Sequence, residues 1–591
     1  MSLAPSEPPP ARPGSRERVW LLAAGALYLA LAVSVVSTRT YWPRYDSAVY
    51  VSGATAIARG VGLRDITSPV TRPAASWAHV PGWIRRSPAL MDRADWPVYG
   101  QYPPLLPLAL APLVTLGGGR FLVLQILPLL AGLGTLGLVY RARGLLFPGP
   151  WPLTVVATAG SMLTLYATRV QTEAVHALLV VATLCLLALA SREPARLGRW
   201  AAAAGLVLAL GVAVHVRLVF LAAGAAAWLL VAPRAPLVRR AAAAAMFAVV
   251  TMAPPVVFTF GVSWAGRAGL PHETTSFTLT SNPYYWTDGW DPSAPQLGRA
   301  DAALRLARRS TSAGRLLWNG LSAGSLYVEP DMLALTVAAG VALLAGPWWR
   351  HRGGLLALPT AAYLAGVLFS PWAESRMAVP VLPVVAHAVA VAAGRLPGLL
   401  GAHGARPGRQ AVAAVGALLL SVQLANWWRL RPALDEYALE YWQHGATLAL
   451  ARVAAQLPSG RVVVAPVDNA AFAIVTGHPT LSTSPIEWKM SDPRVYLASG
   501  GAPVMLTGVV RKERLPDAAA DPALAALAGP RSRLEIDVGG GYAVAAEWVR
   551  EPPILVPADP LVPGRIHPRW MRLSPADRAP LARAAIPAAA P

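Results

Sequence analysis

The sequence predicts an α-helical polytopic membrane protein of about eleven transmembrane helices, with a small extracytoplasmic α/β domain near the C-terminal end. Hydrophobic residues make up 55% of the 591 residues and charged residues only 14%. Long apolar runs alternate with short arginine-bearing turns, and the composition becomes that of a soluble domain from about residue 431. Because a soluble core of this size would need far less apolar surface, the chain is suited to a bilayer.

The formal net charge of +21 raises the question of nucleic-acid binding. The basic residues are nearly all arginine, and they lie in short loops between apolar runs, not on one face of a compact domain. Membrane topology explains that distribution better, so we expect no nucleic-acid partner. The single cysteine, Cys185, excludes a disulfide framework and a thiolate metal site.

The N-terminal stretch has the order of a signal peptide. Residues 1–18 are proline-rich and carry three arginines ahead of an apolar run over 19–37. That run is longer than a usual signal-peptide core and further spans follow, which favours an uncleaved first helix behind a cytoplasmic tail.

Two long polar loops interrupt the apolar runs. In the first, 39–119, the stretch 104–116 is apolar but short and proline-broken, which predicts a re-entrant or interfacial helix and not a span. The second covers 263–330. The remaining spans are expected at 120–140, 151–168, 170–190, 200–215, 217–232, 238–262, 331–347, 353–370, 376–394 and 409–428.

Arginine placement tests this set of spans, because one missed helix would move every later loop to the other side of the membrane. With a cytoplasmic N-terminus, each short cytoplasmic turn carries two or three arginines, thirteen in all, and Glu193 is the only acidic residue among them. Counting 104–116 as a span would turn Arg141 and Arg143 outward. Both polar loops and the C-terminal part therefore lie outside a bacterial cytoplasmic membrane.

The C-terminal part has the pattern of a small α/β domain. The apolar runs 461–467 and 504–508 predict buried strands, 534–549 predicts one or two more, and 448–457 predicts a helix. We expect a transmembrane domain over 19–430, an extracytoplasmic domain over 431–573 and a disordered proline-rich tail over 574–591.

Asp46 is the first candidate site residue, in the stretch Tyr-Trp-Pro-Arg-Tyr-Asp-Ser-Ala-Val-Tyr over 41–50. A helix N-cap is the simpler interpretation, since Asp is a favoured cap. Asp46, Tyr50 and Gly53 nevertheless share one helical face, and the preceding aromatic residues suit a membrane interface. Both interpretations remain open: a cap, or a carboxylate at the mouth of the bilayer.

Glu173 is the second, at the outer end of the fourth span. A charged group inside a span costs roughly 2.5–3.5 kcal/mol on insertion scales, so such an acid usually faces a polar cavity. The alternative is a structural pair with Arg169, one turn away. The topology places Glu173 on the same side as Asp46. A histidine at such a position, here His176, more often forms a hydrogen bond between helices than binds a ligand.

Glu374-Ser-Arg376 forms a third cluster on the outer side, ahead of the tenth span. An interfacial anchor is the ordinary interpretation. The planar guanidinium of Arg376 also suits a phosphate and keeps its charge when partly desolvated. Arg217, beside His215, is a weaker candidate of the same kind.

Several motifs follow one another in a recognisable order: Asp46 and Tyr50 after the first helix, Tyr-Pro-Pro-Leu-Leu-Pro over 102–107, an arginine-ended second span over 138–143, Glu173, then Glu374-Ser-Arg376 with two prolines, and a glycine turn over 474–479. Over about residues 19–490 this order resembles the GT-C class of integral-membrane glycosyltransferases, the bacterial relatives of protein O-mannosyltransferases and lipid A aminoarabinose transferases. Two positions depart from it. Ser47 stands where the class often has a second acid, and Gln101 with Tyr102 stands where aminoarabinose transferases have a lysine.

The resemblance implies transfer of a sugar from a polyprenyl-phosphate donor to an acceptor hydroxyl of a protein, glycan or lipid, with inversion. Asp46 would act as general base with help from Glu173. The donor phosphate would be held by Arg376, with Arg217 or Arg169. Arginine can neutralise a monophosphate, so no metal ligand set is assigned, although members of the class differ and a divalent metal stays open. The expected substrate-cavity residues are Tyr50, Gln101, Tyr102, His176 and Glu374.

Two other classes remain open. A lipid or glycan transporter would also use buried charges, but it should show internal symmetry, which the sequence lacks. A non-catalytic membrane scaffold agrees with the departures at Ser47 and Gln101. The discriminating feature is whether Asp46, Glu173 and Arg376 converge on one outward cavity that opens toward lipid. Separations above about 15 Å would remove most of the support for an enzyme, because general-base catalysis needs hydrogen-bond reach or one bridging water.

Overall fold

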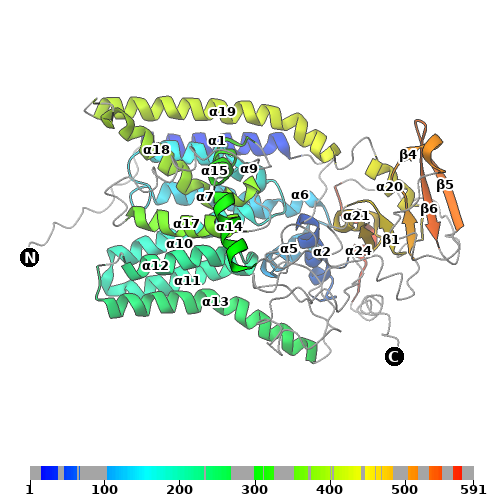
Figure 1. Cartoon of the computed structure of the whole chain (residues 1–591), viewed down its shortest axis with the longest axis horizontal. Coiled ribbons are helices and arrows are strands. Elements are labelled where there is room, and N and C mark those ends of the chain that lie inside the picture. The colour runs from blue at the N-terminus through cyan, green and yellow to red at the C-terminus, as the bar shows by residue number, and fades with distance from the viewer. Residues whose placement is uncertain are drawn as a thin grey trace, which may run out of the picture.

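The computed structural model describes residues 15–36, 46–62, 66, 103–231, 234–267, 298–310, 312–324, 352–369, 374–399, 401, 405–440, 446–458, 461–467, 469–482, 503–516, 532–548 and 564–574. Figure 1 shows the long helices side by side in one lobe and the strands together in a second lobe, with α2, α5, α21 and α24 between them.

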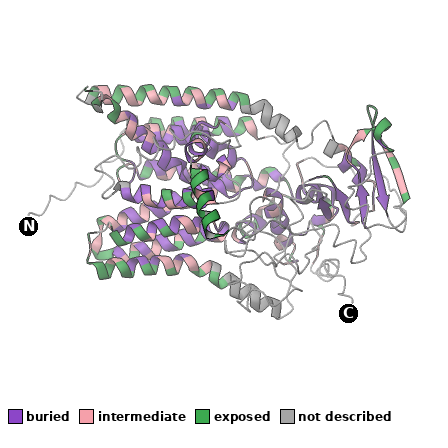
Figure 2. Cartoon of the chain, in the orientation of Figure 1, coloured by how far each residue is buried: buried purple, intermediate pink, exposed green. Residues whose placement is uncertain are grey.

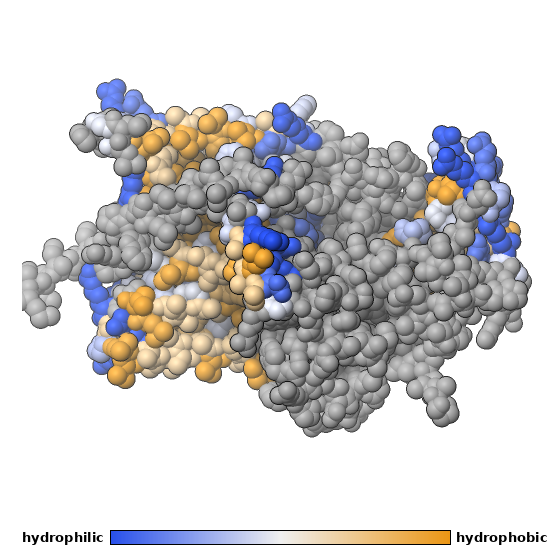
Figure 3. All heavy atoms as spheres, in the orientation of Figure 1, coloured by the Kyte–Doolittle hydropathy of each residue, from blue (hydrophilic) through white to orange (hydrophobic). Residues whose placement is uncertain are grey.

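The helical lobe is that of a multi-pass membrane protein. Seven helical segments within the described ranges are long and apolar enough to cross a bilayer, and α12 and α17 are shorter apolar helices. Their outer faces expose large apolar side chains, such as Val249 at 70% and Leu418 at 67%, which lipid tolerates and water does not. Figure 3 shows this apolar surface over the helical lobe. The predicted class is therefore confirmed, while the span expected at 331–347 lies outside the described residues. The helices are α1 (Ser15–Val35), α6 (Phe121–Leu124), α7 (Ile126–Arg141), α10 (Glu173–Arg192), α11 (Leu197–Val214), α12 (Leu218–Val231), α13 (Leu237–Arg267), α17 (Arg352–Phe369), α18 (Leu382–Leu399) and α19 (Ala405–Glu440).

The segment predicted as one span over 151–168 is two helices, α8 (Trp151–Gly160) and α9 (Met162–Ala167). Ser161 between them is extended, with ψ −179°, and its hydroxyl accepts a hydrogen bond from the Leu163 N–H. Side chains of α19 bond the carbonyls near the break: Gln423 donates to the Ala157 carbonyl and Trp427 to that of Gly160. Such a break is tolerated within a bilayer because neighbouring helices satisfy the freed backbone groups.

Short helices also occupy both polar loops. In the first, α5 (Leu105–Leu116) packs on α2 (Asp46–Ala58), where a Cβ at Gly53 would meet Pro107 at 3.4 Å. In the second, α14 (Arg299–Ser310) precedes α15 (Ala313–Ser322), and α15 is largely buried against α18 and α19. The segment predicted only as an outer loop thus contributes to the core of the bundle.

The strand lobe is a small mixed sheet of order β2-β1-β3-β6-β4, with β5 paired to β6. The first three strands are parallel and β6 runs antiparallel to β3, β4 and β5. The three predicted strand regions and the predicted helix are present, whereas β2, β4 and α21 were not predicted. Because α19 continues to Glu440, the boundary expected at 430 falls inside a helix. The elements are α20 (Ala446–Ala454), β1 (Val463–Ala465), α21 (Asn469–Thr476), β2 (Thr480–Ser482), β3 (Val504–Leu506), β4 (Val510–Arg511), β5 (Ser532–Gly539), β6 (Tyr542–Trp548) and α24 (Pro568–Met571).

One apolar cluster joins the strand lobe to the bundle. It brings together Tyr50 of α2, Leu110 of α5, Ile474 of α21 and Trp570 of α24. The Trp570 indole donates to the Ala473 carbonyl at 2.7 Å, which fixes α24 on α21. Figure 2 shows mostly buried residues, with some of intermediate exposure, in the described helices of this region. The helix that begins at Asp46 is therefore held from both sides.

We expect Gly477→Ala to loosen this junction. Gly477 has φ +74°, and an added Cβ would lie 2.3 Å from the His567 ring, so both backbone strain and a clash oppose the substitution. Strain of this kind costs ~1–3 kcal/mol. Limited proteolysis of the full-length protein should cut the 564–574 segment faster in this variant. Gly118→Ala is the matched control, since its φ is +56° but no atom lies within 4 Å; equal cleavage in both variants would contradict the prediction.

Candidate active site at the meeting of three helix ends

Three helical elements begin at one place between the two lobes. The helix α2 starts at Asp46, α10 starts at Glu173, and the 3-10 helix η5 (Ser375–Val381) follows Glu374. An acid in the first turn is favoured by the partial positive charge of a helix N-terminus. Arginines lie toward the far ends of α10 and of α18, which continues from η5: Arg192 in the last turn of α10, and Arg395 of α18. The acids are thus gathered at one end of the bundle and the turn arginines at the other.

Arg376 lies at the centre of the site and contacts all three carboxylates. Its Nη1 donates to Asp46 Oδ2 at 2.7 Å, and its Nε lies 2.6 Å from Glu374 Oε2 and 3.8 Å from Glu173 Oε1. The side chain of Arg376 is only 11% exposed, and that of Glu173 5%. Asp46, Glu173 and Arg376 therefore converge, although 330 positions separate the first from the last.

Three acids surround the Arg376 guanidinium, and Arg217 adds a second positive charge close to them. Tyr50 is buried beside these acids, and their charges affect the pKa of its hydroxyl. Burial raises the pKa of the Tyr50 hydroxyl well above its ordinary value, the charges of Asp46 and Glu173 raise it further, and Arg217 and Arg376 act in the opposite sense. Tyr50 therefore stays protonated and can donate a hydrogen bond within the site.

Several buried polar atoms around Glu173 lack a hydrogen-bond partner among the described residues. They are Glu173 Oε2, His176 Nε2, Gln171 Oε1 and Ser375 Oγ. A buried polar group without a partner costs roughly 1–3 kcal/mol, so each of these atoms calls for a partner such as an ordered water or a polar ligand. The N-terminal turn of α10 therefore has unused hydrogen-bonding capacity.

Arg217 and two histidines lie beside this turn. The rings of His176 and His215 pack edge to face, with centroids 6.1 Å apart, and the Arg217 N–H donates to His215 Nδ1 at 3.3 Å. Arg169 instead lies over the Tyr166 ring, with 5.5 Å from its guanidinium carbon to the centroid. The expected alternative pair of Arg169 with Glu173 is replaced by the contact between Arg376 and Glu173. Gln101 and Tyr102 lie outside the described residues, next to the buried Pro103 and Pro104.

Sequence reasoning underestimated two features of the site. Glu374, expected only as a cavity residue, approaches Arg376 more closely than either proposed catalytic acid does. Gln171 and Ser375 were not singled out at all. The signal for Gln171 was the polar run Arg-Val-Gln-Thr-Glu over 169–173 between two apolar segments, whereas nothing in the sequence marked the Ser375 hydroxyl.

The arrangement offers two chemical capacities. A guanidinium whose partners are exchangeable carboxylates can bind a phosphate through parallel N–H···O bonds. A carboxylate beside it can accept a proton. Within the described part of the chain, no group of three or more His, Cys, Asp or Glu residues could hold a metal ion.

Comparison with known proteins shows which solved structures have a similar fold. No family model and no curated protein matches the sequence. Among solved structures, ArnT from Cupriavidus metallidurans bound to undecaprenyl phosphate matches with a TM-score of 0.53 and 14% identity, covering 89% of this chain and 98% of that chain. The apo form of ArnT matches with a TM-score of 0.50, 14% identity and coverage of 90% and 98%. The archaeal oligosaccharyltransferase AglB from Archaeoglobus fulgidus, in complex with an inhibitory peptide and a dolichol-phosphate, gives a TM-score of 0.43 at 14% identity and covers 80% of this chain and 65% of that chain. The GT-C resemblance expected from the motifs is confirmed at the level of the fold.

Proposed function

We propose that this protein is a membrane glycosyltransferase that moves a sugar from a polyprenyl-phosphate donor to an acceptor hydroxyl on the outer face of a bacterial cytoplasmic membrane. The observation that carries the proposal is the convergence of Asp46, Glu173 and Glu374 on Arg376 in a GT-C-type fold. The fold is shared with a protein whose structure holds undecaprenyl phosphate, which supports a donor of that chemical class.

In this proposal, Arg376 binds the donor phosphate by exchanging carboxylate partners. A phosphate oxygen accepts the N–H that Asp46 otherwise accepts, at the position now 2.7 Å from Nη1. Phosphate suits the planar guanidinium at least as well as a carboxylate does. The exchange also releases Asp46 from an ion pair that would otherwise weaken it as a base. Donor binding and activation of the base thus become one event.

Asp46 then serves as the general base. The acceptor oxygen attacks the anomeric carbon from the face opposite the phosphate, and its proton moves to the Asp46 carboxylate. The bond from the anomeric carbon to the phosphate oxygen breaks, and its electron pair leaves with the polyprenyl phosphate. Arg376, with Arg217 nearby, stabilises the charge that develops on that leaving group. A single displacement of this kind inverts the configuration of the sugar.

Glu173 and Tyr50 position the acceptor in this scheme. The unpartnered Oε2 of Glu173 can accept a hydrogen bond from a sugar or acceptor hydroxyl, and the Tyr50 hydroxyl can donate one. The helices α21 and α24 support α2 from the outer side, so the base is held by packing on two sides. General-base catalysis requires that the carboxylate be held in one position relative to the acceptor, and this packing restricts its movement.

The outward orientation rests on the turn arginines. Arg143 and Arg192 lie at the ends of α7 and α10 that are remote from Glu173. The positive-inside rule places those ends in the cytoplasm, and so places the site and the strand lobe outside. An acceptor that approaches from the outside would then meet a donor that enters from the lipid.

The lipid-linked sugars of a deletion strain test the function as a whole. Loss of the enzyme should leave its donor unused, so a polyprenyl-phosphate sugar should accumulate and one class of surface glycan should lose a residue. Mass spectrometry of the lipid extract would name the donor. A scaffold would alter surface glycans without accumulation of a lipid-linked monosaccharide, and that result would contradict the proposal.

Glu173→Gln should impair transfer less than loss of the base does. The amide keeps the shape of the side chain but removes the charge and changes its hydrogen bonds, so we expect transfer to fall by about tenfold, through a loss of ~1.4 kcal/mol in acceptor positioning. The rate of product formation in the complemented deletion strain measures this. Glu193→Gln, at the arginine-bearing end of α10, is the matched control; equal losses in the two variants would refute a role specific to Glu173.

A further inference from the structure

A large groove lies at the end of the bundle opposite the candidate active site. Its volume is about 1070 Å³, and its walls come from α1, α8, α18 and α19. Arg395 in this groove and Arg376 in the site are on consecutive helical segments, η5 and α18, so the rise of the two segments separates them by roughly 30 Å along the chain. The volume is at the upper limit of ordinary small-molecule pockets. The groove is therefore separate from the candidate active site and large enough for a long apolar molecule.

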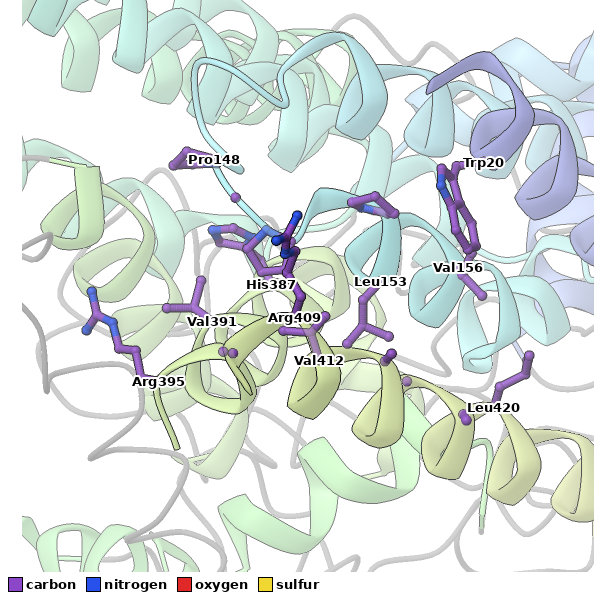
Figure 4. A pocket seen from close by; sticks show the side chains of 18 of the residues that line it. Trp20, Pro148, Leu153, Val156, His387, Val391, Arg395, Arg409, Val412 and Leu420 are labelled. Atoms are coloured by element: carbon purple, nitrogen blue, oxygen red, sulfur yellow. The ribbon is translucent and has the colours of Figure 1, made fainter. Parts of the chain in front are cut away.

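The lining of the groove is amphipathic. Figure 4 shows Arg395, Arg409 and His387 on one side and Trp20, Val156 and Leu420 on the other. His387 is held in place, because its Nδ1 lies 3.2 Å from the Thr154 hydroxyl and its ring packs on Phe147 with centroids 5.2 Å apart. A molecule with a charged head and apolar tails matches this division.

The charges on the polar side select for an anion. Arg395 reaches the groove from α18 and exposed Arg409 reaches it from α19. None of the described residues that line the groove is acidic. Basic pockets between transmembrane helices at the arginine-rich side of a membrane bind anionic lipid headgroups, and guanidinium groups suit their phosphates.

We propose that this groove binds an anionic glycerophospholipid from the leaflet at the arginine-bearing end of the bundle. The headgroup phosphate lies between Arg395 and Arg409, and the acyl chains lie along Val156, Val412 and Leu420. The bound lipid fills the space between α19 and the rest of the bundle. Only 17% of the apolar stretch of α19 is buried by protein, so α19 depends on such filling more than the inner helices do. Because α19 leads toward the strand lobe, the lipid stabilises the connection between the two lobes.

Native mass spectrometry of the full-length protein tests this, with phosphatidylglycerol and phosphatidylcholine titrated in detergent. We expect selective retention of phosphatidylglycerol, weakened about fivefold by Arg409→Gln. Arg406→Gln is the matched control, because Arg406 is also exposed on α19 but lies outside the groove lining. Ala413→Phe should fill the apolar side and release the lipid, whereas Ala414→Phe, one position away and outside the lining, should not.

Three results would overturn the proposal. Equal weakening by Arg406→Gln would mean that the lipid responds only to surface charge. Equal retention of phosphatidylcholine would remove the role of the arginines. Selective binding of undecaprenyl phosphate in place of phosphatidylglycerol would assign the groove to the carrier lipid. None of these readouts uses sugar transfer, so the lipid site and the proposed activity succeed or fail separately.

Discussion

Asp46→Asn is expected to lower sugar transfer by about 10²–10⁴, the range that general-base catalysis contributes. Asparagine has nearly the same shape and can still accept the hydrogen bond from Arg376, but it cannot take the acceptor proton. Binding of polyprenyl phosphate should stay unchanged or tighten, because a neutral amide competes less well than a carboxylate for the guanidinium. Product formation and lipid binding, both measured on the purified full-length protein, give the two readouts.

Asp301→Asn provides the same chemical change on α14, where the solvent-exposed carboxylate accepts the Gly298 N–H at 3.2 Å. That variant should retain wild-type transfer. Transfer at the wild-type rate by Asp46→Asn would remove the base from the mechanism, and the helix-cap interpretation of Asp46 would then be sufficient.

Arg376→Gln is expected to have the second large effect, on both donor binding and folding. Without the guanidinium, Asp46, Glu173 and Glu374 remain together at partly buried positions with no countercharge between them. Removing one partner of a buried ion pair typically costs ~3–5 kcal/mol, and donor phosphate affinity should fall by at least tenfold. Arg376→Lys keeps the positive charge but loses the planar guanidinium, so its stability and its donor phosphate affinity should lie between those of wild type and Arg376→Gln.

A double variant separates the structural effect from the functional one. Adding Asp46→Asn to Arg376→Gln removes one of the carboxylates that lost its countercharge, so thermal stability should partly recover. The effects of the two substitutions on stability should not add, because the two side chains are in contact. Sugar transfer should not recover. Recovery of both would mean that Arg376 serves only to neutralise the acids.

The membrane architecture could be predicted because it depends on local properties of the chain. The length of each apolar run and the sign of the charges at its ends locate the spans, and those properties do not depend on distant residues. The same logic placed Asp46, Glu173 and Arg376 at one end of the bundle. A short helix over 104–116 was predicted for the same reason, since the apolar run is too short to span, and α5 covers Leu105–Leu116.

The details that sequence reasoning missed depend on tertiary partners. The break at Ser161 is stable because Gln423 and Trp427, more than 250 positions away, bond the nearby carbonyls. The burial of α15 depends on α18 and α19, and its own sequence reads as part of a polar loop. The short distance between Glu374 and Arg376 depends on the backbone turn before η5, where Glu374 is extended.

Titration of undecaprenyl phosphate into the full-length protein tests the central claim most directly, because the scheme begins with exchange of a carboxylate for a phosphate at Arg376. Wild type and Asp46→Asn should bind the lipid saturably, and Arg376→Gln should bind it at least tenfold more weakly. Arg196→Gln, an exposed arginine at the other end of the bundle, should match wild type. Equal affinity in wild type and Arg376→Gln would contradict the account.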